Sequence, residues 1–425
     1  MRRPAGQALV LVLAFLASTT LAWLLVFNVG QLVNAKLRLN AAADAAAYSA
    51  AAWEARSLNY QAYLNRAIVA NEVAVAQLVS LRSWSAYLAQ LLKNVSLVSN
   101  VVPPLGRVMH ALERAWHGVD VAVQRGAPPL ESALSRLDVD VLLKAQAFAQ
   151  QQAAIGASDL AERVARDNVP EARVARATSA LQIRNAREFA DLSQIRRHGE
   201  RELAPYVTLL EDARDGFSAR RNQDLVPNNP LVTLPKRGGT DLIGEYAWRG
   251  VDTLASHVNL VLDDVEVPFG WGAAEIRHHA QVRQGTHGGS RRSNPRTTRL
   301  ALATSSPRGG YRGVPEFRDV RGTPDEAGAT VGYTVVLELP TSAVSFADRV
   351  LDASGVLDAA GESHDIGVVS DRPLLALGAA VVRFRRPERR EDGREERPSL
   401  FNPYWEARLA PRPAGGLLLL AGATR

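Results

Sequence analysis

The chain has 425 residues, 47% of them hydrophobic, and a formal net charge of +6. A chain of this length is too long to fold around a single hydrophobic core, so we expect two or three domains. The absence of cysteine excludes disulfides, thiolate metal sites and thiol nucleophiles. The positive charge, mostly arginine, fits contact with anionic lipid, cell-wall polymers or nucleic acid, and fits equally well a solvated basic surface that binds nothing.

An uncharged apolar run from Ala8 to Phe27 stands near the start of the chain. About twenty helical residues span about 30 Å, the thickness of the hydrocarbon core of a bilayer. The run therefore predicts a single transmembrane helix. Its anchoring side chains include Ala8, Leu13, Phe15, Trp23 and Phe27.

The charges around this run predict its orientation. Arg2 and Arg3 precede it, which favours a cytoplasmic N-terminus and places the bulk of the chain on the opposite side of the membrane. The alternative is a cleaved signal peptide with Thr20-Leu21-Ala22 as the cleavage site.

Short motifs flank the apolar run. Gly6-Gln7 opens it, Gly30-Gln31-Leu32 closes it, and an alanine-rich stretch with Asp44 at its centre follows from Asn40 to Ala47. In order and spacing these motifs resemble the N-terminal segment of the TadE/TadG-like proteins of bacterial Flp (tight adherence) pilus assembly. The resemblance covers about the first fifty residues. It implies a single-pass envelope protein whose partners are other pilus-assembly or envelope proteins.

Two features of related proteins are missing here. A pilin-like processing site between Gly6 and Gln7 would call for glutamate where the chain has Leu11, so Gly6 and Gln7 form only a candidate site. Larger relatives carry a von Willebrand-type domain with an Asp-x-Ser-x-Ser metal site. The nearest string, residues 352–356, lacks the second serine, and we transfer no metal site.

The chain is expected to continue as a helix beyond the membrane. Between Val29 and Arg56 there is one glycine and no proline, and alanine, the best helix former, dominates. Such a helix packs either within its own domain or against a partner. Its continuation to Leu92 is too polar for a second span, and Pro103-Pro104 ends it. One buried stripe is expected here: Ala67, Ala70, Ala74, Leu81, Trp84, Leu88 and Leu91.

A second helical region is expected from Leu105 to Arg221. Proline should divide it into pieces, at Pro128-Pro129, Pro170 and Pro205. Residues 172–201 are predicted to form solvent-facing helices. A second apolar stripe is expected in this region: Leu130, Leu134, Leu137, Val141 and Ala145.

Glycine and proline become frequent after Asn222, and short strand-like runs appear. We predict strands at residues 258–262, 299–303, 329–339, 378–384 and 416–420. The fold class is therefore α+β, with a transmembrane helix that continues into a helical region and a strand-containing C-terminal domain. The predicted divisions are residues 1–30, 31–102, 103–225 and 226–425.

Candidate chemistry is weak. His278, His279, His287 and Glu275 match no zinc spacing, and Asp263, Asp264 and Glu266 lack the spacing of a calcium loop. A basic stretch (Arg283, Arg291, Arg292, Arg296 and Arg299) has no interleaved aromatic residues, so we expect no nucleic-acid partner. We predict no catalytic residue, metal or cofactor.

Two aromatic clusters remain, at residues 269–272 and 401–405. Such clusters either cap a core or anchor a partner. Trp271, Tyr404 and Trp405 are the candidate partner-binding residues.

The sequence therefore predicts a non-enzymatic, membrane-anchored component of pilus assembly or envelope secretion. A membrane-tethered envelope hydrolase or metal-dependent enzyme is the first alternative. A secreted adhesin with a cleaved signal is the second.

Overall fold

The structure is a computed structural model. It describes residues 7–175, 179–199, 203–226, 231–260, 263–278, 288–321, 329–347, 372–388, 390–394 and 396–411. The predicted strand at 416–420, Gly6, His279, His287, Arg283 and the string 352–356 lie outside these residues.

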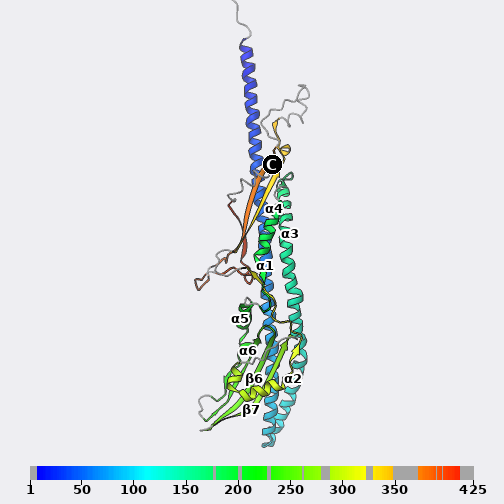
Figure 1. The fold of residues 1–425 in the computed structure, drawn as a ribbon, viewed down its shortest axis with the longest axis vertical. Coiled ribbons are helices and arrows are strands. Elements are labelled where there is room, and N and C mark those ends of the chain that lie inside the picture. The colour runs from blue at the N-terminus through cyan, green and yellow to red at the C-terminus, as the bar shows by residue number, and fades with distance from the viewer. Residues whose placement is uncertain are drawn as a thin grey trace, which may run out of the picture. The chain divides into compact units, whose positions relative to one another are not determined.

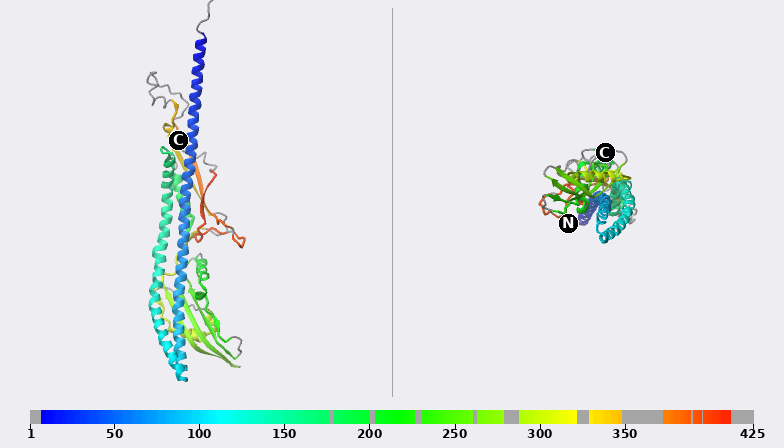
Figure 2. Two further views of the ribbon diagram at one scale, coloured as in Figure 1. Left: turned by 180° about the vertical axis from the view of Figure 1, so that it is seen from behind. Right: turned by 90° about the horizontal axis from the view of Figure 1, so that it is seen from below.

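One helix, α1, runs without interruption from Gln7 to Ser99 (Figures 1 and 2). The prediction of a long apolar helix that continues well past its apolar run is confirmed. The α1 helix ends just before Pro103-Pro104, which open the next helix at its N1 and N2 positions.

The chain forms two compact units, each assembled from separate segments. Unit 1 contains residues 1–60, 149–193 and 320–425, and unit 2 contains residues 61–148 and 194–319. The chain passes between the units within α1, within α3 (Leu143–Asn168) and within the paired strands β2 (Ser193–Ile195) and β9 (Arg318–Val320). The four predicted divisions along the chain stay a prediction.

Unit 1 contains a four-stranded antiparallel sheet in the order β1-β10-β11-β12. Its strands are β1 (Arg173–Val174), β10 (Thr330–Leu339), β11 (Leu374–Phe384) and β12 (Trp405–Leu409). Helix α4 (Ser179–Asp191) contacts β10, and a short 3-10 helix, η3, follows it at Thr341–Ala343. The predicted strands at 329–339 and 378–384 are confirmed.

The core of unit 1 is built largely from alanine. Buried alanines of α1 and α3 share one cluster with Val335 and Leu337 of β10. Small side chains let backbones approach closely, and a Cβ on Gly378 of β11 would collide with the backbone of Ala43 and Asp44. The α1 helix and β11 are therefore in direct backbone contact.

Unit 2 contains a six-stranded sheet with β3-β5-β6-β7-β8 in order and β4 paired with β6. The strands are β3 (Gln223–Asp224), β4 (Val232–Thr233), β5 (Pro235–Ile243), β6 (Ala247–Leu260), β7 (Asp263–Arg277) and β8 (Arg308–Gly309). The helices are α2 (Pro103–Leu137), a π-helix η1 (Asp138–Leu142), α5 (Ala204–Asp212), α6 (Gly216–Ala219), α7 (Gly288–Ser293) and α8 (Pro295–Thr304).

Within unit 2, α1 lies close to the long strands β6 and β7. A Cβ on Gly272 would meet the backbone at Ser83 and Tyr87, and one on Gly250 would meet the Ser83 side chain. Buried apolar residues of α1 and β6 in this unit include Ile68, Val75, Val79, Trp248 and Val251.

Three predicted elements are wrong. The α2 helix continues through Pro128-Pro129, because proline removes one backbone donor but does not stop a helix whose flanking turns are packed. Residues 299–303 lie within α8 rather than a strand. Residues 172–201 combine β1, α4 and β2, so only part of that segment is helical.

The predicted buried stripe of α1 is only partly buried, and the apolar stripe predicted at Leu130 to Ala145 is largely exposed. Ala70 and Leu81 on α1, and Leu130, Leu137 and Val141 on α2 and η1, are exposed. The buried positions beside them carry Glu72, Arg82, Glu131, Ser135 and Asp138. Periodicity identified the apolar faces but not the direction in which each face points.

We expect Gly378→Ala to destabilise unit 1 by about 1–3 kcal/mol, because the new Cβ overlaps the α1 backbone. Gly332→Ala on the neighbouring strand is the matched control, since nothing lies within 4 Å of its Cβ position. Thermal unfolding of the purified full chain measures both. Equal melting temperatures would contradict the close contact.

Candidate functional site

The first candidate site is the apolar segment of α1. Leu13, Phe15, Trp23 and Phe27 expose 57, 67, 76 and 44% of their surface, and Ala8 is also exposed. None of the most apolar eighteen-residue window is buried. Among the described helices, this one is long and apolar enough to cross a membrane.

The few polar side chains of this segment are satisfied within the helix. Ser18 Oγ donates to the Phe15 carbonyl over 2.9 Å, and Thr20 Oγ1 donates to the Leu16 carbonyl over 2.8 Å. Thr19 Oγ1 donates to the Phe15 carbonyl. All three hydroxyl groups therefore donate hydrogen bonds within the helix, so none would lack an acceptor in an apolar medium.

The residues after the apolar segment attach α1 to the rest of unit 1. The Asn28 side chain accepts a hydrogen bond of 2.7 Å from the Ala347 backbone N–H. Lys36 donates to the Leu375 carbonyl, and the alanine-rich stretch around Ala43 packs against β11. The motifs that follow the apolar run thus form a packing surface.

In unit 2, polar side chains join α1 to α2. Arg82 donates to both carboxylate oxygens of Glu131, and Ser85 Oγ donates to Asp120 Oδ1 over 2.5 Å. Gln124 donates to the Arg82 carbonyl. These hydrogen bonds make the interface between the two helices largely polar.

The polar interface continues with a buried pair of carboxyl groups. Glu72 Oε2 accepts from Trp248 Nε1 (2.8 Å) and Tyr311 Oη (2.7 Å), and Asp138 Oδ1 accepts from Asn71 Nδ2 (2.7 Å). Burial raises the pKa of Glu72 to about 7 and that of Asp138 to about 8, and the negative charge of Glu72 adds to the Asp138 shift. Asp138 opens the π-helix η1, a local departure from α-helical geometry.

Asp252 of β6 forms a second buried charge cluster in unit 2. Its carboxylate accepts from Lys236 Nζ (2.7 Å), Arg221 Nη2 (2.8 Å) and Ser83 Oγ (2.7 Å). Burial alone raises its pKa, but Arg221 and Lys236 outweigh that effect and bring the pKa below its usual value. These hydrogen bonds join β6 to α1 and β5.

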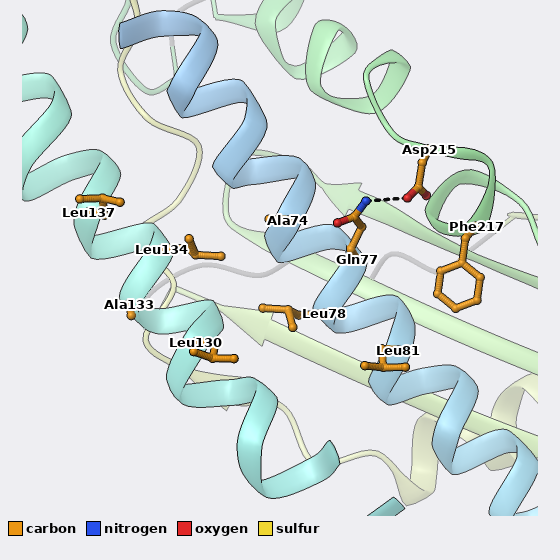
Figure 3. Close-up of a pocket in the computed structure, with 10 residues that line it drawn as sticks. All are labelled: Ala74, Gln77, Leu78, Leu81, Leu130, Ala133, Leu134, Leu137, Asp215 and Phe217. Carbon is orange, nitrogen blue, oxygen red and sulfur yellow. Dashed lines mark hydrogen bonds between the residues drawn. The ribbon is translucent and has the colours of Figure 1, made fainter. Parts of the chain in front are cut away.

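An apolar groove lies on the outward side of α1 and α2. Its volume is about 720 Å³, and Figure 3 shows leucines of the two helices directed into the space between them. Gln77 donates to Asp215 over 2.6 Å at the side where Phe217 of α6 lies. The lining residues are Ala74, Gln77, Leu78, Leu81, Leu130, Ala133, Leu134, Leu137, Asp215 and Phe217.

The aromatic clusters take up mixed positions. Trp405 is 3% exposed, and its Nε1 donates to the Ser399 carbonyl, so it closes the core of unit 1. Tyr404 is half-buried with the Arg386 guanidinium 5.8 Å from its ring centroid, and Trp271 is half-buried on β7.

The histidine and acidic clusters form no metal site among the described residues. No group of three or more His, Cys, Asp or Glu side chains is placed there to hold an ion. Glu275 pairs with Arg249, and Glu266 accepts from the Arg296 and Thr297 N–H groups at the start of α8. Glu266 is therefore a helix cap.

The sequence analysis predicts neither the apolar groove nor the polar interface behind it. The sequence does contain a relevant pattern, because a helix in which Glu131, Ser135 and Asp138 alternate with leucines has one polar and one apolar face. Only the position of α1 shows that the polar face is the buried one.

These observations describe an α+β protein with a long helix, α1, that contains an exposed apolar segment. Residues 6–52 match the model of the Tad family, described as putative Flp pilus-assembly TadE/G-like. No match was found among curated proteins or among solved structures. The resemblance predicted for the N-terminal segment is confirmed, and it supports involvement in Flp/Tad pilus assembly.

We expect the free energy of unfolding to fall as the pH rises from about 5 to 8. Glu72 and Asp138 bind protons more tightly in the folded chain than in the unfolded chain, so each contributes stability at low pH that is lost as pH rises through its folded pKa. The slope is about 1.4 kcal/mol per pH unit for each group. Urea unfolding across this range measures it.

The double variant Glu72→Gln/Asp138→Asn should reduce this slope, and Glu54, whose pKa burial raises to about 8, should account for the part that remains. Asp140→Asn, an exposed acid on the same π-helix paired with Lys144, is the control and should leave the slope unchanged. A double variant with the original slope would contradict the assignment.

Proposed function

We propose that this chain is a membrane-anchored, non-enzymatic component of Flp/Tad pilus assembly or of a related envelope secretion machine. The observation that carries the proposal is the coincidence of the Tad match, residues 6–52, with the exposed apolar segment of α1 and the packing segment after it. The matched residues thus supply both the span and its attachment to a folded unit.

The proposed topology is a single pass through the inner membrane, with a cytoplasmic N-terminus and a periplasmic bulk. The exposure of Leu13, Phe15 and Trp23 supports a lipid environment, because apolar side chains of this size gain free energy on leaving water. Arg2 and Arg3 support the orientation.

A mechanical role is supported by the nature of the described sites. The buried carboxylates of unit 2 are enclosed by protein partners, and the groove is lined mainly by leucine and alanine. An envelope hydrolase would need convergent polar groups in an accessible cleft. We therefore assign the chain to binding other assembly or envelope proteins.

Mass spectrometry of the N-terminus of the chain from washed membranes tests the anchor. We expect the chain to begin at Met1 or Arg2. A start at Gln7 would mean pilin-like processing despite Leu11. A start near Trp23 would mean a cleaved signal and would overturn the proposed anchor.

Charged residues within the apolar segment test the link between anchor and assembly. We expect Leu13→Arg/Leu16→Arg to release the chain from the membrane fraction and to abolish surface pili, since each charge at mid-membrane costs about 2.5–3.5 kcal/mol. The matched control is Leu13→Ile/Leu16→Ile, which should retain both. Normal piliation in a strain that lacks the chain would refute the assembly role.

A further inference from the structure

The outward face of α2 and the start of α3 carries a line of large exposed apolar side chains. They follow one another at steps of 3, 4 and 7 residues, with one step of 11 across Pro128-Pro129, and these spacings are typical of a helix face that packs. Each exposes 39–63% of its surface. The residues are Leu105, Val108, Leu112, Val119, Leu130, Leu137, Val141 and Phe148.

This line meets the apolar groove at Leu130 and Leu137. There α1 contributes Leu78 and Leu81 on the facing side, so the surface is concave. Eight side chains that are roughly half exposed offer about 600–700 Å² of apolar surface, close to the roughly 800 Å² that each partner buries in a standard interface.

A line of arginines runs along the same helix, about 100–160° around its axis from the apolar line. Arg107, Arg114, Arg125 and Arg136 are exposed and stand 7, 11 and 11 residues apart, which are close to whole numbers of helical turns. Arg136 lies one residue, or about 100°, from Leu137. Of the three acids of α2, Glu131 pairs with Arg82 and Asp120 accepts from Ser85, while Glu113 lies between Leu112 and Arg114.

We propose that this surface binds an amphipathic α-helix of a partner protein, with apolar residues in the groove and acidic residues opposite the arginine line. The proposal rests on the proposed function in that it specifies the kind of partner the assembly role requires. Helix-in-groove binding uses this combination of an apolar face and charged flanks.

The charge pattern decides against the other occupants. A second copy would place one arginine line near another, and like charges across an interface oppose association. A bilayer surface would satisfy the arginines but would not fill a concave groove between two helices. A helix with acidic flanks satisfies both features.

A synthetic helix tests the proposal on the purified full chain in detergent. The probe is a fluorescent peptide of about three heptads with leucine at positions a and d and glutamate at e and g. Its control has lysine in place of every glutamate. We expect the glutamate peptide to bind at least about tenfold more tightly by fluorescence anisotropy, with the difference shrinking as salt rises.

Matched variants locate the binding surface. Leu130→Ser/Leu134→Ser should weaken binding of the glutamate peptide at least about tenfold, whereas Ile155→Ser, an equally exposed apolar residue of α3, should not. Arg125→Glu/Arg136→Glu should reverse the preference between the two peptides. Arg163→Glu, an exposed arginine of α3, should leave the preference unchanged.

Four outcomes would overturn the proposal. These are no binding of either peptide, equal binding of both, binding unaffected by the Leu130 and Leu134 changes, and a preference that the arginine reversal leaves intact.

Sedimentation that shows a dimer lost in the leucine variant would identify a second copy as the occupant. If the leucine variant lost binding to phosphatidylglycerol vesicles but still bound the peptide, a bilayer would be identified as the occupant of the groove. These assays use purified protein, whereas the proposed function is tested by the N-terminal mass and by piliation in cells. A negative peptide result would therefore overturn this inference without deciding the proposed function.

Discussion

The uninterrupted backbone hydrogen bonding of α1 is the constraint on which the rest of the structure depends. One helix from Gln7 to Ser99 supplies the exposed apolar segment, the alanine surface of unit 1 and the polar surface of unit 2. Alanine and straight-chain residues sustain a helix of this length without a break. In each unit a glycine of the sheet, Gly378 or Gly272, then lets a strand lie directly against the backbone of α1.

Where α1 meets α2 and η1, unit 2 reverses the usual distribution of polar and apolar side chains on helices. Arg82, Glu131 and Asp138 lie inside with hydrogen-bonded partners, while Leu130, Leu137 and Val141 lie outside. A buried ion pair adds little net stability, since the desolvation penalty offsets the Coulomb attraction, but it specifies which helix faces meet. The exposed apolar surface that results is large enough for a partner and is the feature that most clearly distinguishes unit 2.

The two sites divide the proposed work between them. The apolar segment of α1 has all its hydroxyls bonded internally, as a lipid environment requires. The α1/α2 groove has an apolar lining, and α2 carries the arginine line, as recognition of an acidic amphipathic helix requires. The match of residues 6–52 to the Tad family supports involvement in Flp/Tad pilus assembly.

Local patterns in the sequence determined the long helix, its apolar segment, the Tad-like motifs and the strands at 329–339 and 378–384, because these depend on propensity and spacing within one stretch of chain. Local patterns also identified the leucine face of α2. Tertiary structure alone decided that this face points outward, that α2 continues through Pro128-Pro129, and that residues 299–303 are helical. A periodic pattern defines two faces of a helix, but only packing partners distant in the sequence, here Arg82 and Asn71 of α1, decide which face is buried.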